Sequence, residues 1–204
     1  MGELIVTEFV TLDGIAQAPG GPEEDAAGGF EFGGWQAPII EEASGERMFD
    51  EAKGMDALLL GRRTYDIFAG YWPHAPEEIP FTGLLNRVPK YVASRTLANP
   101  LSWNAATVIE GDVVDAVARI KERHDSVHVI GSLDLVQTLL SARLVDQVEL
   151  WIYPIVLGTG KRVFEPGVAP TAFRVADSVC YPGGTVHLVL RSAGTPAVGD
   201  MTAV

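Results

Sequence analysis

The sequence is poor in cysteine and in basic residues. Cys180 is the single cysteine among 204 residues, which excludes an intramolecular disulfide and any zinc site that needs several cysteines. Only 15 Lys and Arg stand against 27 Asp and Glu, giving a formal net charge of −12. Nucleic acids and anionic membranes are bound through Lys and Arg that neutralise phosphates, so we expect neither as a partner.

Long apolar runs are also missing. No segment approaches the roughly 20 apolar residues of a membrane-spanning helix, and residues 1–10 hold no basic stretch of the kind that begins a secretory signal. We therefore expect a cytoplasmic protein with no membrane segment. With 47% hydrophobic and 21% charged residues the chain can fill a core. We predict one domain over residues 1–191 and a flexible tail over 192–204.

Several catalytic motifs are absent. The sequence contains no G-x-x-x-x-G-K-[ST] loop and no G-x-S-x-G elbow, so neither a P-loop NTPase nor a serine hydrolase is expected. The histidines His74, His124, His128 and His187 lack the spacing of metal ligands, so we expect no metal. The H-x-E and P-C-x-x-C motifs of zinc deaminases are missing too.

The acidic residues are concentrated at the start of the chain. Ten of them lie within residues 1–46, which contain no Lys or Arg. We therefore expect an anionic ligand to be held by later clusters such as Arg62–Arg63 or Lys161–Arg162. The acidic segment is interpreted as a solvated surface loop. Its long Gly- and Pro-rich part, residues 18–34, has the length of a functional or mobile loop.

Short apolar strands alternate with helical segments along the chain. This order predicts an α/β fold with a mostly parallel sheet and an antiparallel edge. Residues 173–179 and 185–191 are predicted to form a terminal hairpin. The other predicted strands are 4–10, 57–60, 90–93, 106–109, 127–130 and 147–157, and the predicted helices are 38–53, 62–69, one capped by Asp112, and 133–144.

Two segments share a construction that suits phosphate binding. An apolar strand runs through Gly61 into a helix at Arg62, and a second runs through Gly131 into a helix at Leu133. Such helix N-termini present free backbone N–H groups and the positive end of the helix dipole. Arg62, Arg63 and Arg95 would add charged contacts to phosphate oxygens. The alternative is that the glycines only make turns and the arginines are solvated.

The order and spacing of five segments resemble the dihydrofolate reductase superfamily. These segments are Thr11–Gly14, Leu59–Tyr65, Val92–Thr96, Val129–Ser132 and Pro154–Gly160. The last of them is most similar to the reductase domain at the C-terminus of the riboflavin-biosynthesis deaminase/reductase (RibD). The resemblance covers residues 2–191. It implies a three-layer α/β/α fold around a central, mostly parallel mixed sheet of about eight strands with an antiparallel C-terminal hairpin.

The resemblance also implies NADPH as the cofactor. Turns after three strands would hold its phosphates, and the loop after the first strand would line the nicotinamide ribose. We see no acidic residue at the 2′-phosphate position, so NADPH should be preferred to NADH. The implied residues are Gly61, Arg62, Arg63, Thr64, Ser94, Arg95, Gly131, Ser132, Leu133 and Asp134 for the phosphates, and Gly14 and Ile15 for the ribose.

The substrate would lie between the helix 38–53 and the long strand 147–157. The substrate-binding residues implied there are Trp35, Phe49, Trp151 and Tyr153. Dihydrofolate reductases carry an acid on the helix before the G-R-x-T motif, and that position falls near Gly45 here. Asp13 and Glu46 are therefore our candidates for the proton donor, with water as the alternative.

These observations predict an NADPH-dependent reductase of the riboflavin/pterin type. Hydride would pass to a C=N or C=O carbon of a flat, nitrogen-rich heterocycle or its ribosyl derivative. A dihydrofolate reductase and a non-catalytic NADPH-binding module remain alternatives. We also expect a homodimer, because residues 151–157 are more apolar than one strand face needs.

Overall fold

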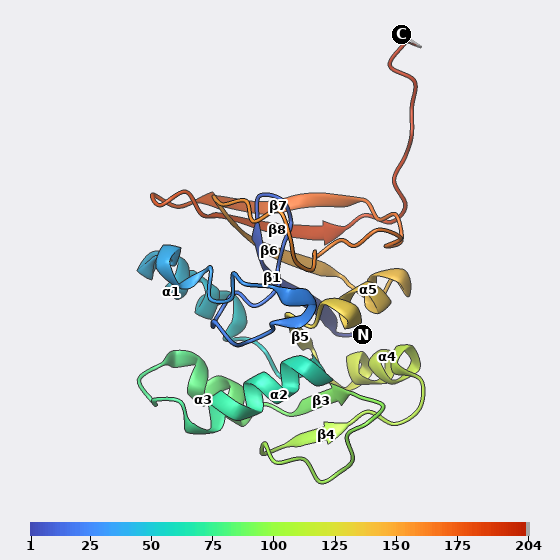
Figure 1. Ribbon diagram of the computed structural model, residues 1–204. Coiled ribbons are helices and arrows are strands. Elements are labelled where there is room, and N and C mark those ends of the chain that lie inside the picture. Colours follow the sequence, from blue (N-terminus) through green and yellow to red (C-terminus); the bar gives the residue numbers. More distant parts are fainter. Residues whose placement is uncertain (203–204) are drawn as a thin grey trace.

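The computed structural model describes residues 1–202, and its centre is a single sheet of eight strands in the order β4-β3-β2-β5-β1-β6-β8-β7 (Figure 1). Strands β1 to β6 run parallel to one another, and β8 is antiparallel to both β6 and β7. The strands are β1 (Glu3–Thr11), β2 (Ala57–Gly61), β3 (Lys90–Ala93), β4 (Ala106–Val108), β5 (Ser126–Ile130), β6 (Gln147–Tyr153), β7 (Phe173–Cys180) and β8 (Val186–Ser192).

Five α-helices cover the two faces of the sheet (Figure 1). Helices α1 (Glu42–Ala52), α2 (Arg62–Tyr71) and α3 (Pro80–Arg87) pack on one face. Helices α4 (Val113–Arg123) and α5 (Leu133–Ser141) pack on the other. Short 3-10 turns are η1 (Ala27–Gly29), η2 (Ala37–Ile39) and η3 (Trp72–His74). The predicted three-layer fold with a mostly parallel sheet and a C-terminal hairpin is confirmed.

Alternation along the strands sends successive side chains to opposite layers. Leu59 and Val129 pack with α4 and α5, whereas Leu58 and Leu60 pack with α1, α2 and α3. The central strand β2 is buried on both faces, which explains its continuous apolar sequence.

Three elements differ from the sequence-based prediction. Helix α3 was not predicted; it is short, and Pro80 at its start is its strongest sequence signal. Helix α1 begins at Glu42, not at Pro38, because Glu41 has extended backbone angles and forms a capping box with Ser44. Strand β6 ends at Tyr153 because Pro154 lacks the N–H that the sheet ladder requires.

The predicted tail, residues 192–204, begins one residue inside the last strand. Ala193 still donates its N–H to the carbonyl of Ala172 at 2.7 Å, and the later residues run away from the body (Figure 1). Residues 203–204 of that predicted tail lie outside the described residues. Within residues 1–202, no helix is long and apolar enough to cross a membrane.

Candidate functional site

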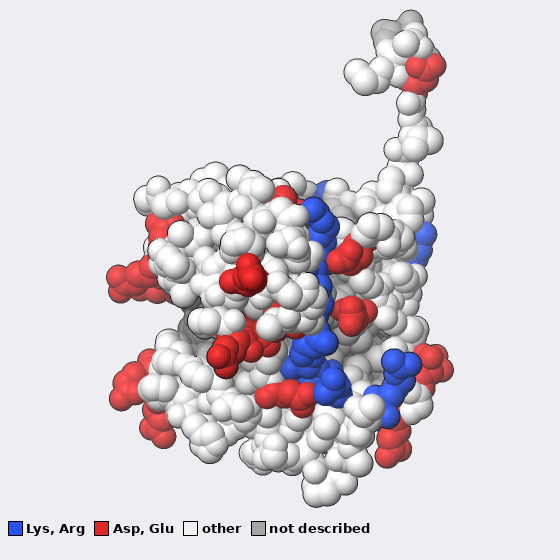
Figure 2. All heavy atoms as spheres, viewed as in Figure 1, with Lys and Arg blue, Asp and Glu red and all other residues white. Residues whose placement is uncertain are grey.

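A cavity of about 1000 Å³ lies at the carboxyl ends of the central strands. Strand β5 ends at Ile130, opposite Thr7, whereas β1 continues beside β6 as far as Thr11. The sheet therefore opens next to β1, and the cavity reaches residues from both of its faces. Figure 2 shows the surface indented between α1 and α3. In open α/β sheets, ligands bind at this kind of position.

One part of the cavity, here called the helix-end half, is formed by turns that follow β2, β3 and β5. It contains Gly61–Thr64, Ser94–Thr96 and Gly131–Asp134. All ten residues predicted to hold phosphates line this half. The structure thus brings them together, and their contact with a cofactor stays a prediction.

The two helices that begin in this half have no side-chain cap. Neither Gly61 at the start of α2 nor Ser132 at the start of α5 caps its helix with a side chain. Helix α4 also begins at the cavity wall, where Val113 lines it, but this helix is capped by the Asp112 carboxylate, which accepts from two backbone N–H groups. The free N–H groups of α2 and α5 are therefore available for an anion.

Ser132 joins the two helix starts. Its Oγ accepts from the N–H of Gly61 at 2.9 Å and donates to Thr64 Oγ1 at 2.9 Å. Gly131 before it has φ +66°, a conformation that favours glycine, and a side chain there would meet Thr64 at 3.8 Å. These contacts hold the two N-termini at one place in the cavity.

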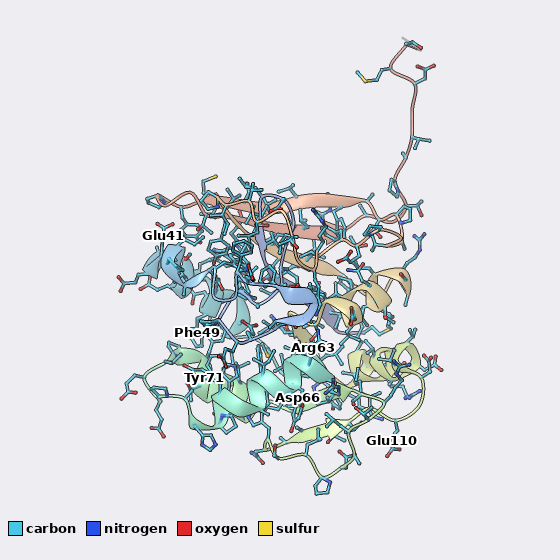
Figure 3. All side chains as sticks on the ribbon, in the orientation of Figure 1. Glu41, Phe49, Arg63, Asp66, Tyr71 and Glu110 are labelled. Carbon is cyan, nitrogen blue, oxygen red and sulfur yellow. The ribbon has the colours of Figure 1, made fainter. Side chains whose placement is uncertain are left out.

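Basic side chains gather in a column over the middle of the face shown in Figure 2, and Arg63 is labelled in the same view in Figure 3. Arg63 pairs with Asp25 at 3.1 Å, and Lys161 pairs with the same carboxylate at 2.5 Å. Burial opposes ionisation of Asp25, but the hydrogen bond and charge of Lys161 prevail and lower its pKa. Arg62 pairs with Asp66 at 3.0 Å.

These pairs correct two expectations. Acidic residues do lie beside the proposed 2′-phosphate position, since Asp25 and Asp66 are bonded to its arginines. The acidic loop is also not simply solvated, because the Asp25 side chain is only 13% exposed and lines the cavity. The sequence could not show this, since Asp25 lies 38 residues before Arg63.

The other part of the cavity, here called the recess, is lined by apolar and aromatic side chains of the α1–α3 layer. Its floor is the sheet, where Thr7, His128, Ile130 and Glu149 face the same side. Its walls are Phe9, Met48, Ala52, Phe68, Trp72, Phe81 and Leu85. Such a space, with apolar walls and a few polar groups on its floor, suits a flat polar heterocycle.

Two titratable groups lie on the recess floor. Burial, and secondarily the charge of Glu51, raises the pKa of Glu149 to about 7. Glu149 accepts from Gln147 Nε2 at 2.7 Å and from Thr7 Oγ1 at 3.3 Å. Burial lowers the pKa of His128 to about 4, so its ring is neutral, and its Nδ1 has no hydrogen-bond partner.

A third titratable group, Glu8, lines the cavity from the opposite face of the sheet. It is 2% exposed, its Oε1 has no hydrogen-bond partner within residues 1–202, and burial raises its pKa to about 8. Glu8, His128 and Glu149 were not among the predicted site residues. The available signal was a titratable residue inside an otherwise apolar strand, as in the segments 4–10 and 147–153.

None of the four residues predicted to bind substrate lines the cavity. Trp151 is fully buried and stacks on His187 with ring centroids 3.9 Å apart. Trp35 and Tyr153 pack against each other, and Tyr153 accepts from Gln36, which does line the cavity. Phe49 packs on the wall residue Phe81 with ring centroids 5.5 Å apart, and so supports the recess without lining it.

The two proposed proton donors also lie elsewhere. Asp13 holds a loop, since its carboxylate accepts from Thr11 Oγ1 at 2.6 Å and from the N–H of Gly158 at 2.8 Å. The hydrogen bond from Thr11 lowers the pKa of Asp13, which is the wrong direction for a general acid. Glu46 is exposed on α1 and does not line the cavity.

Gly14 and Ile15 lie just outside the cavity. Gly14 accepts from the N–H of Val163 at 3.0 Å, and Ile15 is completely buried. The following residues, from Ala16 to Gly20, line the cavity in their place. The cavity is thus lined by the part of this loop that follows the two predicted residues, and contact of the loop with a cofactor stays a prediction.

Comparison with solved structures finds proteins of similar fold. A crystal structure of a putative riboflavin biosynthesis protein from Shewanella sp. PV-4 covers 94% of this chain and 99% of its own, with TM-score 0.70 and 20% identity. A pyrimidine reductase-like protein from Corynebacterium diphtheriae covers 94% and 92%, with TM-score 0.65 and 13% identity. At these identities the two structures establish the fold alone.

Sequence comparison extends this likeness to the family. The chain is 28% identical over 144 residues to the uncharacterized protein YyaP of Bacillus subtilis, a match that spans 69% of this chain and 76% of that protein. The family model described as the RibD C-terminal domain matches residues 3–187, nearly the whole of this chain. The protein belongs to the RibD C-terminal domain family.

Proposed function

We propose that this protein is an NADPH-dependent reductase that transfers hydride to a C=N or C=O carbon of a flat, nitrogen-rich heterocycle or its ribosyl derivative. The observation that carries the proposal is that one cavity joins two uncapped helix N-termini to a recess with a polar floor. Family membership supports a reductase of the riboflavin pathway as the general class.

The helix-end half fits a dinucleotide phosphate. Free N–H groups of α2 and α5 would bind the pyrophosphate, and Arg62, Arg63 and Arg95 would bind the 2′-phosphate. Arg95 forms no ion pair with the residues described, so its charge is free for a ligand. The bound cofactor would supply the hydride, and the protein would supply position and electrostatics.

Reduction of a C=N bond also consumes a proton, for which we propose Glu149. With a pKa raised to about 7 it holds a proton for much of the time at neutral pH and can still release it. Glu149 lines the recess floor, where Gln147 and Thr7 hold its carboxyl, and a substrate bound in the recess would lie beside it. No carboxylate of α1 lines the recess, which argues against the acid position of dihydrofolate reductases.

Cofactor binding is the first test. Titration should give a lower Kd for NADPH than for NADH, and Arg62→Ala should weaken NADPH binding about tenfold or more, because a hydrogen bond to a charged group contributes roughly 1.5–3 kcal/mol. Arg119→Ala, an exposed arginine on α4 away from the cavity, serves as the matched control. Equal wild-type affinities for the two cofactors would contradict the proposed cofactor choice.

Turnover is the second part of the test. NADPH oxidation should be measured with 5-amino-6-(5-phosphoribosylamino)uracil and, separately, with dihydrofolate. Faster turnover of the aminouracil supports the proposal, and turnover of dihydrofolate alone would favour a dihydrofolate reductase. Tight NADPH binding without turnover of either would favour a binding module.

We also propose that the protein acts as a homodimer in the cytoplasm. Within the apolar stretch 151–157, Trp151 and Tyr153 are fully buried by their own chain, and Val156, 65% exposed, is the large hydrophobic residue that is open to pairing. Strand β7 ends the sheet, and Val175 on it is 59% exposed. Light scattering should give about twice the chain mass of 21.9 kDa, and the single-chain mass would contradict the dimer.

A further inference from the structure

Glu8 is a buried acid without a structural task. Its neighbours on the α4–α5 face of the sheet are apolar, with Val6 and Val10 along β1 and Leu150 opposite on β6. The Glu8 side chain is 2% exposed, lines the cavity, and leaves its Oε1 without a hydrogen-bond partner. Buried polar atoms in native proteins nearly always have a partner, so the Glu8 carboxyl, on a residue that lines the cavity, is a candidate for ligand binding.

Glu8 is a neutral acid at pH 7. Burial is the cause that raises its pKa to about 8, with no charged neighbour contributing. Asp134 on α5 and Lys161 after β6 line the same cavity, and Glu149 and His128 lie on the other face of the sheet. A protonated carboxyl offers one O–H donor and one C=O acceptor side by side.

A primary carboxamide has the matching pair of groups. Its C=O can accept from the Glu8 O–H while its N–H donates to the Glu8 C=O, which gives two parallel hydrogen bonds. A phosphate offers mainly acceptors and would leave the second Glu8 oxygen without a donor. An ionised Glu8 would be an acceptor only and could not donate a hydrogen bond to the carboxamide oxygen.

The position of Glu8 fits the uncharged end of the cofactor. The N–H of Gly131, at the start of the α5 turn, donates to the carbonyl of Thr7, the residue before Glu8. The Glu8 backbone is therefore next to the proposed pyrophosphate site, on the side away from the arginines. Resting on the proposed function, we infer that Glu8 binds the carboxamide of the nicotinamide ring.

Two ligands separate this inference from the function on which it rests. NADPH carries the carboxamide, and 2′-phospho-ADP-ribose carries the same phosphates without the ring. Glu8→Leu should weaken NADPH binding about tenfold through the loss of two hydrogen bonds and leave the binding of 2′-phospho-ADP-ribose unchanged. Glu8→Gln, whose amide keeps a donor and an acceptor, should retain most of the NADPH affinity.

The pH profile gives a second readout. In the wild type, NADPH affinity should fall between pH 7 and pH 9.5 relative to 2′-phospho-ADP-ribose, as Glu8 ionises. In Glu8→Gln this relative fall should disappear, and this variant decides the question if Glu8→Leu fails to fold. The inference would be overturned if Glu8→Gln showed the same relative fall of NADPH affinity with pH as the wild type. It would also be overturned if Glu8→Leu weakened the binding of both ligands equally. Failure of 2′-phospho-ADP-ribose to bind the wild type would overturn the proposed function instead.

Discussion

The helix-end half of the cavity is made of turns and helix starts, whereas the recess is made of side chains from many separate elements. In the former, three short runs of sequence supply backbone N–H groups and arginines. In the latter, β1, α1, α2, η3, α3, β5 and β6 each contribute one or two side chains. Phosphate groups are common to many nucleotides and can be held by the main chain. Substrate identity therefore depends on the recess, where single side chains decide what fits.

The largest effect should come from the recess floor. Glu149→Gln keeps the shape of the side chain and removes its proton, so kcat should fall about 10²–10⁴-fold if Glu149 is the general acid. The wild-type kcat should decline as the pH rises above about 7, and this decline should vanish in the variant. Steady-state kinetics of NADPH oxidation with the aminouracil substrate would measure both.

The matched control is Glu46→Gln on the exposed side of α1, which should leave kcat unchanged. The Kd for NADPH should remain the same in both variants, since neither residue is among those proposed to bind NADPH. If Glu149→Gln keeps the pH profile and kcat within a few-fold, the proton comes from water or another group. A large loss of kcat in Glu46→Gln would contradict the assignment of the proton donor to the recess floor.

The next largest effect should be a pH dependence of the free energy of unfolding, to which buried titratable groups on both faces of the sheet contribute. Glu8 and Glu149 keep a proton in the folded protein at pH values where the unfolded chain has lost it, so their contribution to stability is lost as the pH rises. His128 and His187, whose pKa values burial lowers to about 4, act in the opposite direction up to about pH 6.5. The net loss should therefore be clearest between about pH 6.5 and 8.

Over that window Glu8 alone should cost about 2 kcal/mol of unfolding free energy, at about 1.4 kcal/mol per pH unit. Urea denaturation at pH 6.5 and pH 8 would measure this loss in the wild type. Glu8→Gln should flatten it, and Glu149→Gln should do so less, because the Glu149 pKa lies only slightly above pH 6.5. A wild type equally stable at both pH values would show that Glu8 ionises without cost.

The difference between the halves also explains which residues could be found from the sequence. A strand, a glycine and a helix start are contiguous, so Gly61–Thr64 and Gly131–Asp134 could be identified locally, and the family resemblance set their order. The recess depends on which face a side chain takes and how far along the strand it lies. Glu149 and Trp151 point to the same face, but Trp151 is two residues further along and is covered by His187. To tell the lining residue Glu149 from the covered residue Trp151, one must know that β6 pairs with β8. This pairing places His187 opposite Trp151, although the two residues are 36 positions apart in the sequence.

The smallest effect should come from Asp25 at the mouth of the cavity. Its carboxylate bonds Arg63 and Lys161, the charges that a cofactor phosphate would use. Asp25→Asn would free both cations, and NADPH should bind about two- to fivefold more tightly, because ion pairs whose cation is partly exposed, as Arg63 and Lys161 are, contribute less than about 1 kcal/mol. Titration in low and high salt would measure the gain, which screening should remove. Asp50→Asn on α1, also paired with a lysine but away from the cavity, is the control. Weaker NADPH binding in Asp25→Asn would show that Asp25 serves mainly to hold the loop of residues 16–20 in place. Phosphate binding in the helix-end half would then depend, like the recess, on side chains that are distant in the sequence.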